Sequence, residues 1–320
     1  MSETRCLTAP AELAGLRLDV ALTRLAPDLS RARVQRLLDE GHVRLGGRAA
    51  KPATRLRGGE EVVLTLPDPE PSGLVAQDLP LQVLFEDGDL LVLDKAPGMV
   101  VHPARGTPHS TVVNALLHRF GQASAPCERL GLVHRLDKDT SGCLVVAKTE
   151  ASLSALQAAF KRREVEKTYL ALCHGRLAPE GRLDTPYGRH PGDRTRYTSR
   201  LREGTRRALT AWRVREAFAG ATLAEVALHT GRTHQIRVHL ADQGHPLLAD
   251  AAYGGRKREA RLPPGDPVRR AAEAIGRQAL HACRLAFPHP RTGAPVRFEA
   301  PPPADFAAAL AILRGAPQSR

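Results

Sequence analysis

The sequence predicts an α+β protein, in which a large, mixed and mostly antiparallel sheet with flanking helices follows a small N-terminal α+β domain. Short apolar runs of strand character outnumber helical patterns and do not alternate regularly with them, which argues against a doubly wound sheet. The chain of 320 residues also exceeds the usual size of one domain. The run PDPEPSG at 67–73 holds three prolines and one glycine and cannot continue a helix or a central strand. We therefore expect a small domain over residues 12–66, a linker over 67–77 and a large domain over 78–315.

The small domain is expected to consist of two helices on a small sheet. Leucine and valine residues predict a first helix near 16–25, and Ser30 is a suitable N-cap for a second helix that ends at Gly41. Apolar stretches at 42–45 and 61–66, the first of them followed by a Gly-Gly turn, predict the strands of a hairpin-like sheet.

Basic residues outnumber acidic ones in the chain as a whole. There are 47 Lys and Arg against 34 Asp and Glu, which gives a net charge of +13. This excess favours a polyanionic partner such as nucleic acid, although an ordinary basic enzyme would have the same composition. In the small domain, a positive face is expected from Arg31, Arg33, Arg36, Arg44 and Arg48. By number alone, these arginines also fit a solvated surface.

In the large domain, strands and one clear early helix follow from the apolar pattern. The helix is predicted over 151–162, where Leu and Phe recur at helical spacing, and an alanine-rich helix is predicted near the C-terminus. The predicted strands lie at 79–84, 90–94, 144–149 and 167–173.

Several classes of function lack their motifs in this sequence. The five cysteines form no CxxC pair, so neither a disulfide framework nor a zinc ribbon is indicated, and a reducing cytoplasm is expected. No glycine-rich phosphate loop, dinucleotide fingerprint or metal-ligand spacing is present, so we expect neither cofactor nor metal. No apolar run approaches the roughly 18 residues of a membrane span, and the N-terminus does not resemble a signal peptide.

Three polar segments remain as candidates for chemistry. Asp137 lies in a polar loop of GLVHRLDKDTSGCLVVAKT, where a carboxylate could be catalytic or could simply cap a turn. Tyr169 lies on a strand in EKTYLALCHG, where a core role is equally open. In GRTHQIRVHLADQGHPLLAD, Thr233 is expected to cap a helix that starts at His234, and Arg237 has apolar neighbours. Because an unpaired buried charge is costly, Arg237 is expected to face a carboxylate from elsewhere in the fold.

Taken together, these motifs resemble those of the RluA family of RNA pseudouridine synthases. The resemblance rests on HRLDKDTSG, the downstream KTY and GRTHQIRVHL, in the order that the family has them. The segments LVLDKAPGMVVHPA and RQALHACRLAFPHP also resemble family segments. SRARVQRLLDEGHVRLGG is similar to the small alpha-L RNA-binding domain of a small-subunit ribosomal protein, which points to the branch that acts on large-subunit (23S) ribosomal RNA.

The resemblance implies a cofactor-free isomerisation of uridine and a role for each matching residue. Asp137 falls on the catalytic carboxylate, Arg237 on its ion-pair partner, and Tyr169 on the tyrosine that stacks on the uracil. Arg135 falls on the residue that replaces the extruded base, and Leu240 on a position that packs near it. Attack on the sugar and a glycal route both remain open.

The same resemblance implies a partner and a location. We expect a cytoplasmic monomer that acts on large-subunit ribosomal RNA or on a ribosome-assembly intermediate. The alternatives are the same chemistry on transfer or messenger RNA, and a non-catalytic RNA-binding assembly factor.

Overall fold

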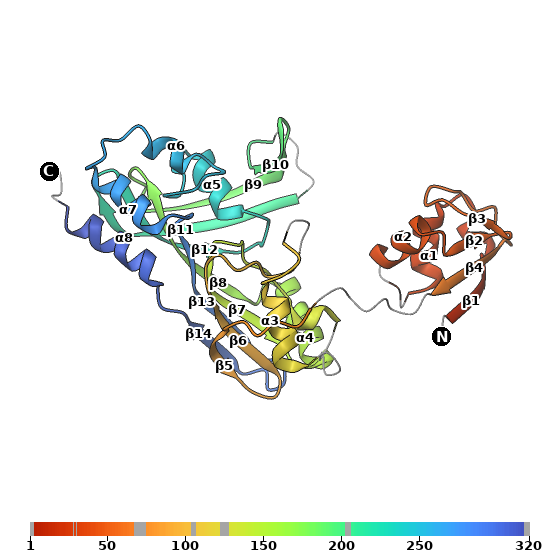
Figure 1. The fold of residues 1–320 in the computed structure, drawn as a ribbon. Helices are drawn as coiled ribbons and strands as arrows, with labels where there is room; N and C mark the ends of the chain where they lie inside the picture. Colours follow the sequence, from red (N-terminus) through yellow and green to blue (C-terminus); the bar gives the residue numbers. More distant parts are fainter. Residues whose placement is uncertain are drawn as a thin grey trace. The chain divides into compact units, whose positions relative to one another are not determined.

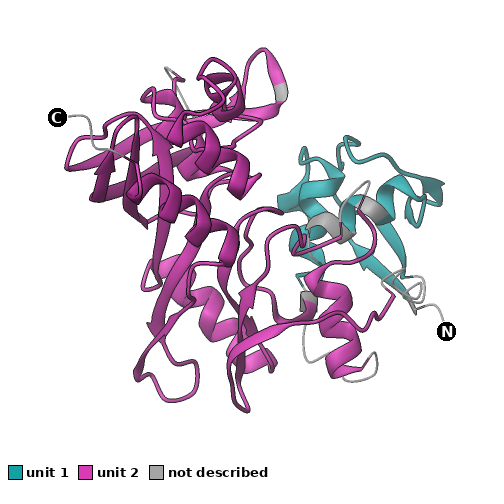
Figure 2. Cartoon of the chain, turned by 60° about the vertical axis from the view of Figure 1, so that its left-hand side comes forward, with its two compact units in different colours: residues 1–73 teal, residues 74–320 magenta. Residues whose placement is uncertain are grey.

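The computed structural model describes residues 3–316, except 28, 30, 67–74, 104–106, 122–127 and 202–205. The chain divides into two compact units, Met1–Gly73 and Leu74–Arg320, which are teal and magenta in Figure 2. Each unit has a hydrophobic core of its own. Within the described residues, no helix is long and apolar enough to cross a membrane.

The smaller unit is a four-stranded antiparallel sheet covered by two helices, as Figure 1 shows. Its strands, in spatial order, are β1 (Glu3–Thr8), β4 (Glu61–Leu66), β2 (Val43–Leu45) and β3 (Arg48–Ala49). Helices α1 (Leu18–Leu25) and α2 (Arg31–Asp39) contribute leucines to the core, and a short 3-10 helix spans Ala11–Leu13. Strand β1 was not predicted from the sequence, because ETRCLT has no clear apolar pattern, and Leu7 is only partly buried against the core. The expected N-cap Ser30 lies outside the described residues.

The larger unit is built on one ten-stranded sheet (Figure 1). Its strands, in spatial order, are β10 (Asp193–Thr198), β9 (Glu180–His190), β11 (Arg206–Phe218), β12 (Ala221–Leu228), β8 (Glu166–His174), β13 (Leu280–Pro288), β7 (Ser141–Ala147), β6 (Leu90–Lys95) and β5 (Gln82–Glu86), with β14 (Pro295–Glu299) paired to β13. Among the described strands, β13 and β7 are paired in parallel and all other pairs are antiparallel. The prediction of a mixed, mostly antiparallel sheet is thereby confirmed.

Helices cover both faces of this sheet, which explains why its central strands are apolar on both sides. On β6, Leu91 and Leu93 pack with α3 and α5, whereas Leu90 and Val92 pack with α4 on the opposite face. On β8, Leu172 contacts the cluster formed by α7 and α8. The helices of this unit are α3 (Val112–Phe120), α4 (Glu150–Arg162), α5 (Gln235–Asp242), α6 (Gly255–Glu259), α7 (Pro267–Ile275) and α8 (Ala304–Arg314), and a 3-10 helix spans Glu128–Gly131.

Two glycines bracket the loop that carries Asp137. At Gly131 (φ +72°) a Cβ atom would lie 1.9 Å from the carbonyl oxygen of Ala147, and at Gly142 (φ +113°) it would lie 2.2 Å from that of Ala282. Gly142 faces Ala282 in the parallel pairing of β7 and β13. Only glycine combines positive φ with so close a backbone approach, so the two ends of the loop are fixed against neighbouring strands.

Gly142→Ala is therefore expected to destabilise the larger unit by roughly 2–4 kcal/mol, through an unfavourable φ and a backbone clash. The matched control is Gly254→Ala, which has a similar positive φ (+100°) but open space around the new Cβ. It should cost only about 1–2 kcal/mol, from the left-handed backbone alone. Differential scanning calorimetry of both variants measures the difference. Equal shifts in melting temperature would show that the close approach of β13 does not constrain Gly142.

Candidate active site

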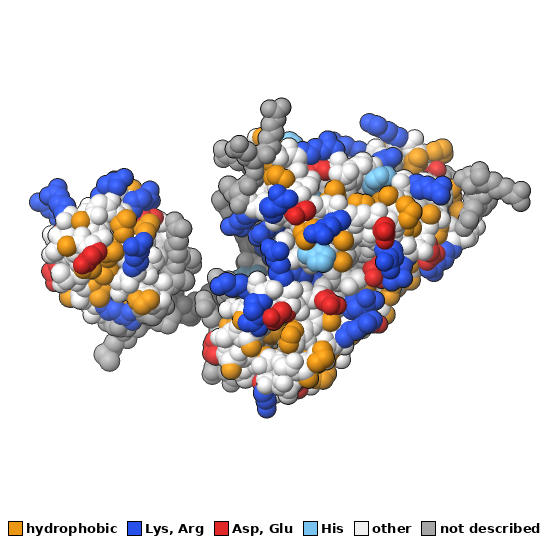
Figure 3. All heavy atoms as spheres, turned by 180° about the vertical axis from the view of Figure 1, so that it is seen from behind, with side chains coloured by type: hydrophobic (Ala, Val, Ile, Leu, Met, Phe, Trp, Pro, Cys, Tyr) orange, Lys and Arg blue, Asp and Glu red, His pale blue; other side chains and the backbone are white. Residues whose placement is uncertain are grey.

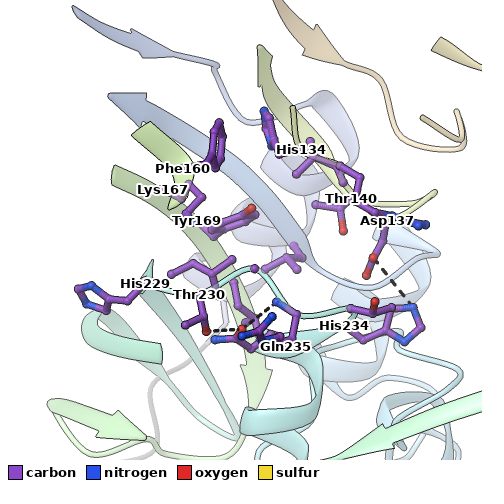
Figure 4. A pocket seen from close by; sticks show the side chains of 18 of the residues that line it. His134, Asp137, Thr140, Phe160, Lys167, Tyr169, His229, Thr230, His234 and Gln235 are labelled. Atoms are coloured by element: carbon purple, nitrogen blue, oxygen red, sulfur yellow. Dashed lines mark hydrogen bonds and ion pairs between the residues drawn. The ribbon is translucent and has the colours of Figure 1, made fainter. Parts of the chain in front are cut away.

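A pocket of about 560 Å³ in the larger unit brings together the three polar segments selected from the sequence. It is lined by residues of the 133–140 loop, the end of α4, the start of β8 and the stretch from the end of β12 into α5. Asp137, Tyr169 and Arg237 all line it, although 100 residues separate the first from the last. Figure 4 shows Asp137 and Tyr169 within this pocket.

The carboxylate of Asp137 points into the pocket and does not cap a turn. The turn at this position is closed by the main chain, since Thr140 N–H donates to the carbonyl oxygen of Asp137 at 3.1 Å. Oδ2 of the carboxylate accepts from Arg237 Nη1 at 3.1 Å, and Oδ1 lies 4.0 Å from His234 Nε2. The side chain is 18% exposed. An acid in this position is held by one partner and still open to a ligand.

Arg237 is the centre of an ion triad. Its guanidinium binds Asp250 through two bonds, Nε to Oδ2 at 2.7 Å and Nη2 to Oδ1 at 2.9 Å, and its Nη1 is left for Asp137. Burial opposes the charged form, but the two carboxylates outweigh it and raise the pKa of Arg237. Asp137 is therefore a carboxylate partner of the kind predicted for Arg237. The paired Nε and Nη2 donors of the guanidinium bind a second acid, Asp250.

Asp250 is fully buried, and its own orientation is fixed by the main chain. Oδ1 accepts from the N–H groups of Ala252 (2.9 Å) and Tyr253 (3.1 Å). Asp250 was not among the residues predicted from the sequence, although an acid at the end of the apolar run HPLLAD was a usable signal.

The start of α5 differs from the expectation. The helix begins at Gln235, and its N-cap is His234 in the left-handed conformation (φ 59°) without a side-chain cap bond, so the predicted Thr233 cap is wrong. Instead, the carbonyl oxygen of Thr233 accepts from Tyr187 Oη at 2.5 Å. His234 Nδ1 bonds with Tyr253 Oη at 2.8 Å, and burial lowers the pKa of His234. A neutral imidazole therefore lies beside Asp137 at neutral pH.

Lys95, at the end of β6, forms a hydrogen bond with the main chain of the loop that carries Asp137. Its side chain is almost fully buried, and Nζ donates to the carbonyl oxygens of Ala96 (2.7 Å), Met99 (2.9 Å) and Lys138 (3.0 Å). Burial lowers the pKa of Lys95 to about 8, while the charges of Asp139 and Asp137 act in the opposite direction. This lysine ties β6 to the residue that follows Asp137, a role that sequence analysis did not assign.

Comparison with known proteins identifies the family. Residues 89–242 match the family described as RNA pseudouridylate synthase, and residues 16–62 match the S4 domain. Proteins called ribosomal large subunit pseudouridine synthase D from Xanthomonas campestris pv. campestris and Nitrosomonas europaea are both 43% identical to this chain; they match 98% of it, over 93% and 89% of their own lengths. The chain belongs to the RNA pseudouridylate synthase family. The family and the RNA-binding N-terminal domain predicted from the sequence are thereby confirmed.

Two solved structures support the fold of this synthase. Human RNA Pseudouridylate Synthase Domain Containing 1 matches with a TM-score of 0.56 at 26% identity, over 77% of this chain and 99% of that one. Human RNA Pseudouridylate Synthase Domain Containing 4 matches with a TM-score of 0.55 at 25% identity, over 73% and 93%.

Tyr169 forms part of the pocket wall of the synthase. It is a buried residue of β8, and no described residue forms a hydrogen bond with its hydroxyl. Burial raises its pKa above the usual value, and the negative charge of Asp137 adds to the effect. The phenol is therefore protonated at any physiological pH.

The remaining predicted RNA contacts fall in different places. Arg135 is exposed and lines the pocket. Leu240 is fully buried among core residues and does not line the pocket; Ile236, one turn earlier on α5, does. The side chain of Leu240 therefore has no surface that could touch RNA in this structure. In the S4 unit, Arg44 and Arg48 are exposed on β2 and β3, and the side chains of Arg31, Arg33 and Arg36 lie outside the described set.

Asp250→Asn is expected to lower the free energy of unfolding of the larger unit by about 3–5 kcal/mol, because it leaves a buried guanidinium without its main partner. Single-turnover conversion of uridine should also slow, since Arg237 is no longer held in line with Asp137. The matched control is Glu216→Gln, which removes the partner of Arg314 in a surface pair and should cost about 1 kcal/mol or less. Calorimetry and rapid-quench kinetics check both effects. Wild-type stability and rate in Asp250→Asn would contradict a supporting role for Asp250.

Proposed function

We propose that this synthase converts uridines to pseudouridine in large-subunit ribosomal RNA, with Asp137 as the catalytic carboxylate. The observation that carries the proposal is the Asp137 side chain, which is the single carboxylate among the described residues lining the pocket and is bound by Arg237. The reaction breaks the bond from ribose C1′ to uracil N1 and joins C1′ to C5. The proton that leaves C5 is balanced by one gained at N1, so no cofactor is consumed. An ionised carboxylate beside the ribose serves both routes, attack at C1′ and removal of the 2′-proton.

Tyr169 is proposed to stack on the extruded uracil and to assist proton transfer at C5. Because burial raises its pKa, the residue acts as a neutral phenol, which accepts a proton only while it donates its own. Arg135, exposed at the pocket, is proposed to fill the space that the uridine leaves in the RNA.

Ribosomal RNA is proposed as the substrate on three grounds. The 43% identical relatives are named for the large ribosomal subunit, the chain carries an S4 domain, and its net charge is +13. Residues 161–207 contain 13 Lys and Arg against six Asp and Glu, which suits binding to backbone phosphates. On the face of the larger unit drawn in Figure 3, blue Lys and Arg side chains are more widespread than red acidic ones. Arg44 and Arg48, with Arg31, Arg33 and Arg36, are proposed to bind RNA in the S4 unit, and ribosome assembly in the cytoplasm is the proposed setting.

A non-catalytic assembly factor would not need this arrangement. A protein that only binds RNA gains nothing from a pocket acid held by a buried arginine, since apolar residues in place of a buried ion triad are often neutral or stabilising.

The direct test is carbodiimide-based mapping of pseudouridine in total RNA from cells with and without this protein. Specific positions in large-subunit ribosomal RNA should lose their signal in its absence and regain it with the wild-type chain. Asp137→Ala should fail to restore them, because no carboxylate then faces the ribose. The matched control is Asp78→Ala, an exposed acid outside the pocket, which should restore them fully. Signal restored by Asp137→Ala would remove the catalytic assignment, and loss confined to transfer or messenger RNA would remove the substrate assignment.

A further inference from the structure

Lys167 places a half-buried ammonium in the pocket without a charged partner. It lines the pocket from β8, two residues before Tyr169, so that both side chains leave the strand on the same side, about 7 Å apart. Its Nζ lies 5.6 Å from the centre of the Phe160 ring, and no described residue accepts a hydrogen bond from it. In Figure 4, Lys167 lies beside Phe160, on the side of Tyr169 away from Asp137.

The neighbours of Lys167 cannot neutralise it. His134, which stacks on Phe160 with ring centres 5.1 Å apart, accepts a hydrogen bond from Val145 N–H through Nε2, so its other nitrogen carries the proton. Burial and the charge of Lys167 lower the pKa of His134 to about 3, which keeps the imidazole neutral. Burial likewise lowers the pKa of Lys167 to about 8. An unpaired ammonium of this kind destabilises the free protein.

Lys167 therefore lacks an anionic partner in the pocket. Two exposed cations, Lys161 and Arg163, line the same pocket from the end of α4, and neither has an ion pair among the described residues. Among the described residues that line the pocket, the single carboxylate is Asp137, and it is already bound by Arg237. Three cations and one aromatic ring around an opening without an available carboxylate form a site for a phosphate group.

We propose that Lys167, supported by Lys161 and Arg163, binds a backbone phosphate next to the extruded uridine. The inference rests on the proposed stacking of that uridine on Tyr169, because the same strand then presents the base platform and the phosphate ligand within the length of one nucleotide. Ligand binding supplies the negative charge that the protein lacks. Lys167 is thus a positioning residue, whose unfavourable burial in the free enzyme is offset when RNA is bound.

The test compares Lys167→Gln with Lys257→Gln, an exposed lysine outside the pocket. The probe is a synthetic RNA hairpin with a uridine that the wild-type enzyme converts, made with normal phosphates or with one neutral methylphosphonate on either side of that uridine. Single-turnover kinetics give the half-saturating enzyme concentration and the maximal rate. Lys167→Gln should raise the half-saturating concentration about tenfold or more, leave the maximal rate within about threefold, and lower the salt slope of binding by about one.

The methylphosphonate separates the phosphate contact from other roles. At one flanking position it should weaken binding by the wild type and by Lys257→Gln, but add little to the loss in Lys167→Gln. Lys167→Gln should melt at or above the wild-type temperature, since it removes an unpaired cation, and Lys167→Arg should regain much of the affinity. Equal methylphosphonate losses in wild type and Lys167→Gln, or a fall in maximal rate at unchanged half-saturation, would overturn the proposal in favour of a contact to the base. Failure of the proposed function would appear differently, as a wild-type enzyme that converts no ribosomal hairpin.

Discussion

The ion triad of Asp250, Arg237 and Asp137 is the interaction on which the site depends. Arg237 gives both arms of its fork to Asp250, whose carboxylate is fixed in turn by two main-chain N–H groups. The remaining guanidinium donor, Nη1, is thereby directed toward Asp137 and binds its Oδ2. A carboxylate on a loop thereby receives a defined orientation, from a group that cannot lose its charge near neutral pH.

The main chain of the loop that carries Asp137 is fixed as well, because neighbouring strands hold both ends of the loop. Gly131 and Gly142 place the ends of the loop against the backbone of neighbouring strands. The Lys95 ammonium donates a hydrogen bond to the carbonyl oxygen of Lys138. Elsewhere on the pocket wall, the side chains of Tyr169 and Lys167 have no polar partner among the described residues. The groups that orient Asp137 have hydrogen-bond partners within the protein, whereas the two side chains that we propose to contact RNA have none among the described residues.

Sequence patterns predicted most of this fold and the residues with the most distinctive motifs. Apolar runs gave the sheet class, and the apolar neighbours of Arg237 predicted a carboxylate partner. Asp137 and Tyr169 were assigned only because HRLDKDTSG and KTY resemble motifs of the family. Lys95 and Lys167 were not assigned, because their contacts join distant segments that no local pattern encodes. Asp250 was overlooked, although it ends the apolar run HPLLAD. Leu240 was proposed from the resemblance alone, and the structure instead places Ile236, one turn earlier on α5, in the pocket wall. The left-handed turn at His234 likewise displaced the expected Thr233 cap.

The central claim is that an extruded uridine lies with its ribose against Asp137. The most direct measurement is a crystal structure of the isosteric Asp137→Asn variant bound to an RNA hairpin that carries a convertible uridine. We expect that the uridine leaves the RNA stack, that its ring lies on Tyr169, and that its C1′ and 2′-hydroxyl contact the side chain at position 137. A uridine still stacked within the RNA, or a ribose closer to a different acid, would contradict it.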